Sequence, residues 1–448
     1  MSELKIISRH AGTVLVGQLA VMAFGVADTM IAGRYSDEAL AALSVGSAIY
    51  ISVYVGLIGI VQALLPIWAE LRGAGKHEAV GRSLRQSLYL SGAIVLVGMT
   101  ALFFPAPLLR WAQVPEPMQA EVQRYLDVLA FAFAPALLFR VYSSFNQSLG
   151  KPLLVTWLQV GALVVKIPLS IWLVAGGAGV QPMGAAGCAW ATLVVNYLLL
   201  LLAFIMLRTQ SLYEPYRLWR AVEAPDWQQI GRFLRLGVPA GLSYLVEVTS
   251  FTLMAVFIAR LGTTASASHQ IASNLAAVLY MLPLSVGIAA SSRVSYWLGA
   301  GDAGKAHGAI RLGFQMVLAA ALLLCGGLLM TREWLAQVYA RNPDVVAMAV
   351  PLLAWVALYH FFDALQCLCV FFLRCFSVVI APLVVYCLLL WGGGLAGGYL
   401  LAYEGLGPWP ATGTAAAFWA ASAIALGATA MVFLAILWRV MKQHRRVG

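Results

Sequence analysis

The stretch AELRGAGKHEAVGRSLRQS, residues 69–87, recurs 226 residues later as SYWLGAGDAGKAHGAIRLG, residues 295–313. A second pair follows further along each half, where GVQPMGAAGCAW (179–190) resembles GPWPATGTAAAFW (407–419). Self-similarity at a fixed spacing indicates a repeated architectural unit. The chain is therefore expected to consist of two related halves.

Composition places these halves in a membrane. The 448 residues are 62% hydrophobic and only 10% charged, whereas soluble domains carry about 25% charged residues. A spanning helix needs about 20 apolar residues. The fold class is therefore an all-α polytopic membrane protein, with twelve transmembrane helices expected at 11–33, 40–69, 84–106, 122–148, 152–176, 184–207, 230–260, 266–298, 307–330, 344–373, 377–402 and 413–438.

The one long polar connection, around Arg220, divides the chain into residues 1–220 and 221–448. Each half holds six expected helices. Because six is even, both halves enter the membrane from the same side, and the repeat is parallel. Two pseudo-symmetric six-helix bundles facing a central cleft are typical of alternating-access transporters. A duplicated membrane scaffold without transport is the alternative.

The basic residues orient the chain. With the N-terminus inside, the inner loops and tails hold twenty of the 28 lysines and arginines, Arg374 among them, and the outer loops hold six. This excess predicts that both termini are cytoplasmic. It also accounts for the net charge of +10 without a nucleic-acid partner.

Five charged side chains stand out inside the apolar stretches of expected helices: Asp28, Arg140, Lys166, Glu247 and Asp363. A charge at the centre of a membrane helix costs about 2.5–3.5 kcal/mol on insertion scales. Such residues usually face a cavity or a charged partner. Their distribution is uneven, because the first half has one acid with two cations and the second half has two acids with none in the surrounding apolar stretches.

Glu247 and Asp363 are expected near the same membrane level, judged from a rise of about 1.5 Å per residue. Two such carboxylates cannot both stay ionised, so one carries a proton or a metal cation lies between them. This is what a proton- or sodium-coupled site requires. The alternative is two separate acids, each hydrogen-bonded in place. Tyr359 precedes Asp363 by one turn and can lie beside it.

Asp28 lies in FGVADTMIAG, residues 24–33. Lys166 of the same half can form a buried ion pair with it, which is a structural interpretation. The functional interpretation is a proton-switched or cation-binding acid whose pairing changes during transport. Four amides are further candidates for a polar cavity, or for hydrogen bonding between helices: Gln270, Asn274, Gln62 and Asn196.

Several stretches together resemble the multidrug and toxic compound extrusion (MATE) transporters, and among them the NorM-like bacterial branch. They are FGVADTMIAGRYSDEALAALSVGSAIY, GVPAGLSYLVEVTSF, ASHQIASNLAAVLYMLPLSVGIAASSRVSYWLGAGDAGKA and YHFFDALQ. The resemblance covers nearly the whole chain. It implies a functional acid in the N-terminal bundle at Asp28, and cation binding at Glu247 and Asp363 with Tyr359, where Na⁺ is the metal if coupling uses sodium.

One departure concerns the fifth helix. Members often carry an asparagine-rich stretch there, whereas this chain has KIPLS, with Lys166 and Ser170. A lysine at this position can act as an internal cation beside Asp28. A direct metal-binding role for Asp28 is therefore in doubt.

The resemblance predicts a monomeric antiporter of the bacterial inner membrane. It would export amphipathic, often cationic drugs and dyes in exchange for Na⁺ or H⁺, without another cofactor and surrounded by lipid. A flippase for lipids or lipid-linked glycans is the alternative, although it would need a cationic cavity. An enzyme is disfavoured because no GxSxG or HExxH motif occurs. No P-loop is present either, so ATP is not expected to be the direct energy source.

Overall fold

The computed structural model describes residues 2–111, 116–177, 179–405, 407–408 and 410–447, and these are almost entirely helical. The helices are α1 (Glu3–Tyr35), α2 (Asp37–Gln62), α3 (Leu64–Gly73), α4 (His77–Phe103), α5 (Ala106–Trp111), α6 (Glu116–Ser148), α7 (Leu153–Ala175), α8 (Ala185–Thr209), the 3₁₀ helix η1 (Ser211–Tyr216), α9 (Trp227–Ala259), α10 (Thr263–Gly299), α11 (Ala303–Tyr339), α12 (Pro343–Cys375), α13 (Ile380–Tyr386), the π-helix η2 (Cys387–Ala396), α14 (Gly397–Tyr399), the π-helix η3 (Leu400–Glu404) and α15 (Ala415–Val447).

Within the described residues, twelve helical segments are long and apolar enough to cross a membrane. The expected all-α fold with twelve spans is confirmed. The second span, Asp37–Gly73, contains a break between α2 and α3. Proline has no backbone N–H, so Pro66 cannot donate to the carbonyl of Gln62, the residue at which α2 ends.

The repeated stretch forms the same turn in both halves. Gly75 and Gly301 end their helices with positive φ angles of 70° and 75°. The next residue donates its backbone N–H five residues back in each case, from Lys76 to Leu71 and from Asp302 to Trp297, both at 3.0 Å. This pattern is a Schellman cap, which favours glycine because only glycine adopts positive φ without strain. The repeat is thus present in the backbone as well as in the sequence.

The residues pack into two compact units, Val16–Gly241 and Met1–Leu15 with Leu242–Gly448. The first is called the N-terminal unit here and the second the C-terminal unit. Their boundaries fall inside α1 and α9. These bounds describe packing, whereas the ranges 1–220 and 221–448 describe the sequence repeat and stay a prediction.

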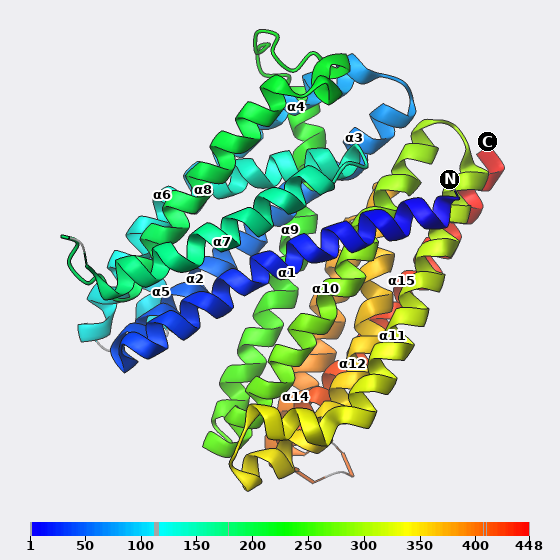
Figure 1. Cartoon of the computed structure of the whole chain (residues 1–448). Helices are drawn as coiled ribbons and strands as arrows, with labels where there is room; N and C mark the ends of the chain where they lie inside the picture. The colour runs from blue at the N-terminus through cyan, green and yellow to red at the C-terminus, as the bar shows by residue number, and fades with distance from the viewer. Residues whose placement is uncertain (1, 112–115, 178, 406, 409, 448) are drawn as a thin grey trace. The chain divides into compact units, whose positions relative to one another are not determined.

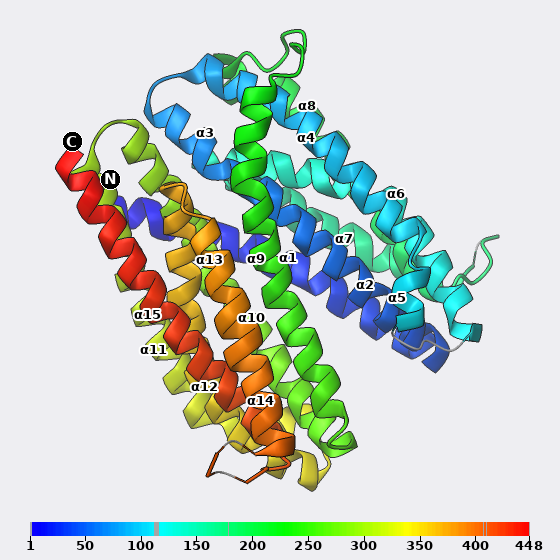
Figure 2. The same ribbon diagram turned by 180° about the vertical axis from the view of Figure 1, so that it is seen from behind.

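Each unit is built around one central helix. In the N-terminal unit α6 contacts α2, α4 and α8, and in the C-terminal unit α12 contacts α10, α11 and α15 (Figures 1 and 2). The two central helices are the fourth span of their halves. Both carry a proline, Pro135 and Pro351.

The connection between the halves is held against α4. The Arg85 guanidinium donates to the Glu223 carboxylate, with an Nε–Oε2 distance of 2.9 Å, and to the backbone oxygen of Arg217 at 2.9 Å. Gln86 donates to the carbonyl of Ala224 at 3.0 Å and accepts from the N–H of Asp226 at 2.9 Å. These contacts fix the polar connection to the N-terminal unit.

The Arg85 interaction lowers the pKa of Glu223 from 4.5 to about 2. A carboxyl group whose pKa is lower in the folded than in the unfolded protein stabilises the fold at pH values above its unfolded pKa. This stabilisation is lost as the pH falls through the folded pKa of about 2. We therefore expect Glu223→Gln to lower the apparent melting temperature by about 2 °C, equally at every pH between 6 and 8. Below pH 4, the melting temperatures of the variant and of the unaltered protein should become more similar.

Thermal unfolding in detergent across this pH range is the measurement. Glu214→Gln, on the same connection but without such a contact among the described interactions, is the matched control. A loss that is the same for both variants would remove the Arg85–Glu223 contact as a stabilising interaction.

Candidate functional site

Asp28 and Lys166 form a buried ion pair in the N-terminal unit. The Lys166 ammonium lies 2.9 Å from both carboxylate oxygens of Asp28 and donates to Thr192 Oγ1, also at 2.9 Å. An ammonium has three N–H donors, and all three have an acceptor here. Asp28 is 8% exposed and Lys166 1% exposed, so the pair is largely withdrawn from solvent.

Helices α1, α7 and α8 supply this cluster. Ser170, one turn after Lys166 on α7, donates its hydroxyl to Asp28 Oδ1 at 3.2 Å. Thr192 donates in turn to the carbonyl of Cys188 on its own helix at 2.9 Å. The proposed contact between Lys166 and Asp28 is therefore present. The pair is neutral as a whole and needs no external ion.

Glu247 and Asp363 occupy the C-terminal unit, on α9 and α12. They lie close enough to affect one another electrostatically. Gln366 Nε2 donates to Asp363 Oδ1 at 2.8 Å, and the Gln366 side-chain oxygen accepts from the Tyr386 hydroxyl. Within the described part of the chain neither carboxylate forms an ion pair. The two acids thus lack the internal cation that Asp28 has.

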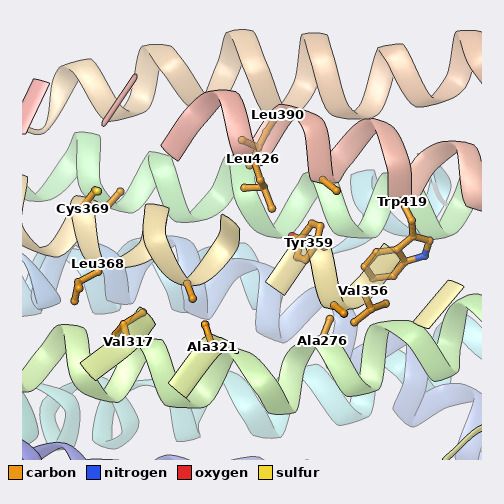
Figure 3. Packing of buried hydrophobic residues seen from close by; sticks show 14 of the residues in the cluster. Ala276, Val317, Ala321, Val356, Tyr359, Leu368, Cys369, Leu390, Trp419 and Leu426 are labelled. Atoms are coloured by element: carbon orange, nitrogen blue, oxygen red, sulfur yellow. The ribbon is translucent and has the colours of Figure 1, made fainter. Parts of the chain in front are cut away.

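Three aromatic rings form a cluster in the same unit, and two of them line a cavity together with Glu247. Tyr359, Phe251 and Trp419 contact one another edge to face, with centroid distances of 5.4–5.9 Å. Trp419 Nε1 donates to His269 Nδ1 at 3.2 Å. Figure 3 shows Tyr359 and Trp419 next to each other in the buried packing. Rings in this arrangement offer π faces to a cation.

A small cavity joins the carboxylate to the rings. Its volume is about 10 Å³, enough for roughly one water-sized particle. Glu247, Phe251 and Tyr359 line it, together with Leu390 and Gly394 of η2. No group of three or more His, Cys, Asp or Glu side chains suited to a metal exists among the described residues. A bound Na⁺ would therefore rest on two carboxylates and neutral oxygens.

The MatE family model matches residues 14–172 and 239–400, one segment in each half. A protein of Aromatoleum aromaticum named "Probable multidrug resistance protein NorM" is 36% identical over 98% of this chain and 94% of its own length. The "Multidrug resistance protein NorM" of Vibrio cholerae is 31% identical, over 97% of this chain and 94% of its own.

This chain is a NorM-like MATE transporter.

Solved structures agree with this fold. The eukaryotic MATE transporter AtDTX14 aligns with a TM-score of 0.87 at 18% identity, over 99% of this chain and 98% of that one. The Vibrio cholerae MATE transporter VcmN in the bent form aligns at 0.85 with 19% identity, over 99% and 98%. MATE proteins are carriers, so the expectation that the chain is not an enzyme is confirmed.

The four candidate amides lie on α2, α8 and α10. Gln270 Nε2 donates to Asn274 Oδ1 at 3.2 Å on one exposed face of α10. Gln62 is the last residue of α2, and Asn196 lies half-buried on α8, one turn after Thr192. Their roles in a polar cavity stay predictions.

Arg374 of this MATE transporter corrects one expectation. The sequence placed it in an inner loop, yet it lies in the last turn of α12, buried to 6% exposure. Its guanidinium donates to the Tyr244 hydroxyl at 3.2 Å and stacks over that ring at 4.8 Å. The positive charge of Arg374 acts electrostatically on the Glu247 carboxylate. The second half therefore contains a buried cation near its acids, although not in contact with them.

Gln366 and Trp419 are site residues that sequence reasoning missed. Gln366 is three residues after Asp363, a spacing that places both on one helix face, and this signal was available. Trp419 corresponds to Trp190 in the repeat, but Trp190 is 43% exposed and Trp419 fully buried. The repeat alone gives no reason to prefer one of them.

The Asp28–Lys166 pair allows a stability test. Lys166→Met leaves Asp28 buried without a cation, and breaking a buried pair costs about 3–5 kcal/mol. The double variant Asp28→Asn with Lys166→Met removes both charges, so it should lose less stability than the single variant. Apparent melting temperatures of the purified proteins measure both.

Lys151→Met, at an exposed lysine of the same unit, controls for the loss of a positive charge. The pair would have no stabilising role if Lys166→Met melted at the same temperature as this control.

Proposed function

We propose that the protein is a secondary antiporter that exports amphipathic, often cationic organic compounds in exchange for Na⁺ or H⁺. The observation that carries this proposal is the pair Glu247 and Asp363, two buried acids without an ion-paired cation in the described structure. Relatives named multidrug resistance proteins NorM and PmpM support the substrate class.

The coupling ion is proposed to bind at Glu247 and Asp363. Two carboxylates in a region of low dielectric repel each other unless a proton or a metal cation reduces their charge. Gln366 holds one oxygen of Asp363, which leaves the other oxygen and Glu247 free to bind the ion. Carboxylates suit a hard cation as well as a proton.

A cationic substrate would compete for the same charge. The rings of Tyr359 and Phe251 line the small cavity together with Glu247, and aromatic faces attract organic cations. A substrate cation that approaches the carboxylates lowers their affinity for the coupling ion. A bound coupling ion likewise lowers their affinity for the substrate. Alternating access of two six-helix bundles would turn this competition into exchange.

Asp28 and Lys166 are assigned a different role. Their pair is already neutral, so an ion or proton can bind Asp28 only when Lys166 moves away or loses its proton. We propose that this pair is a proton-sensitive or substrate-linked element of the N-terminal unit. The flippase alternative finds no support in the named relatives.

We further propose a bacterial inner-membrane location with both termini cytoplasmic, as the distribution of basic residues predicts. A monomer is sufficient for this function, because both acid clusters are formed within a single chain. The same proposal includes a lipid environment, organic cations as the natural substrates, and either Na⁺ or H⁺ as the coupling ion.

Efflux of a cationic dye from proteoliposomes, with Na⁺ and H⁺ gradients imposed separately, tests the function. The unaltered protein should respond to at least one gradient. Glu247→Gln and Asp363→Asn should each reduce gradient-driven efflux to the rate of protein-free liposomes, because an amide does not take up a proton in this range and lacks the negative charge that attracts a metal cation.

Glu333→Gln, an exposed acid of the same unit, is the matched control and should retain efflux. Elution as a single species in size-exclusion chromatography establishes that each variant is folded. Gradient-driven efflux at the normal rate by both Glu247→Gln and Asp363→Asn would contradict the coupling assignment.

A further inference from the structure

An apolar groove of about 550 Å³ lies in the N-terminal unit, and none of its lining residues belongs to the Asp28–Lys166 cluster. Helices α4, α6 and α8 form it, with Trp219 of the connection at one end. Figure 2 shows these three helices together on one side of that unit. Its volume is in the range of about 300–1,000 Å³ that small-molecule sites have.

The rim of the groove is apolar and open. Leu88 on α4 is 45% exposed, and Leu201 and Phe204 on α8 are 55% and 53% exposed. These residues lie in spanning helices, and an exposed apolar surface on such helices is of the kind that hydrocarbon covers in a membrane. An acyl chain is therefore a chemically suitable occupant of the groove.

A second cavity, of about 380 Å³, adjoins the first and shares Leu207, Leu218 and Trp219 with it. Trp219 Nε1 donates to the carbonyl of Leu207 at 3.1 Å, and its ring contacts Phe204 at 4.9 Å. The indole thus stands where the apolar groove meets a polar mouth, a position typical of tryptophan at a membrane interface.

The mouth has excess positive charge. Arg208, Arg217 and Arg220 line it together with one acid, Glu214. Arg217 and Arg220 share a single further carboxylate, Glu78, at 2.8 and 3.4 Å. Three guanidinium groups therefore face two carboxylates.

Arg208 and Arg85 differ in how their charge is used. The Arg208 guanidinium lies 5.3 Å from the centre of the Trp219 ring, a contact that leaves its charge uncompensated. Arg85 also lines the apolar groove, but the Glu223 carboxylate binds it at 2.9 Å. The charge available to a ligand is thus at the mouth and not on the groove floor.

We propose that this groove binds an anionic phospholipid of the cytoplasmic leaflet, with an acyl chain against α6 and the phosphate at Arg208 and Arg220. Basic pockets between membrane helices on the cytoplasmic side bind anionic head groups. An apolar groove continuous with a cationic mouth matches both parts of such a lipid. A cationic drug is disfavoured as the occupant, because the mouth is also positively charged and would repel it.

The test uses phosphatidylglycerol with a photoreactive diazirine in the acyl chain, added to the full-length protein in phosphatidylcholine nanodiscs. Cross-linked peptides are mapped by mass spectrometry. Cross-links should concentrate in residues 138–145 and 200–207, and unlabelled phosphatidylglycerol should compete for them while phosphatidylcholine does not.

The double variant Arg208→Gln with Arg220→Gln should weaken this competition roughly 25-fold, since each basic residue near the surface contributes a factor of about five. Arg311→Gln with Arg439→Gln, two exposed arginines of the C-terminal unit, is the matched control with the same net charge. It should behave as the unaltered protein does.

Three outcomes would overturn the proposal: cross-links spread evenly over the lipid-facing helices, equal competition by both lipids, or an equal effect of the two double variants. The comparison of the two lipids needs only the unaltered chain, so a variant that fails to fold does not prevent the decision.

Discussion

A charge withdrawn from water must be neutralised by a partner, a proton or an ion, and this constraint separates the two acid clusters of the transporter. Asp28 has its partner within the chain, because Lys166 contacts both of its oxygens at 2.9 Å. Among the described residues, Asp363 accepts a neutral hydrogen bond from Gln366, and Arg374 acts on Glu247 electrostatically without forming an ion pair with it. The first cluster has its own counter-charge, whereas the second is the one for which we propose an exchangeable proton or metal cation.

The two units use one scaffold for this unequal chemistry. Both end the repeated helix with a glycine of positive φ, and both place the fourth span of the half at the centre. At the repeat spacing of 226, Asp28 corresponds to Met254 and Glu247 to Val21. Met254 lines the small cavity beside Glu247. The same region of the scaffold therefore carries an ion pair in one unit and, in the other, an acid to which no ion pair is assigned among the described residues.

Hydropathy and the repeat were sufficient to predict the twelve spans, because the bilayer fixes helix length and polarity. The Asp28–Lys166 contact could be proposed since an isolated charge in that segment is costly. The burial of Arg374 could not, because a basic residue at a helix end reads equally as a loop charge. The aromatic cluster around Trp419 depends on which face of α15 packs inward, and the exposure of its repeat partner Trp190 shows that sequence similarity does not decide this.

Ion release on substrate binding is the most direct test of the claim that the exchangeable cation belongs to the C-terminal pair. A cationic dye is added to the purified protein in weak buffer, and released H⁺ and Na⁺ are measured. The account predicts that the unaltered protein and the double variant Asp28→Asn with Lys166→Met both release an ion, and that Asp363→Asn does not. Release that persists in Asp363→Asn and disappears in the double variant would contradict it.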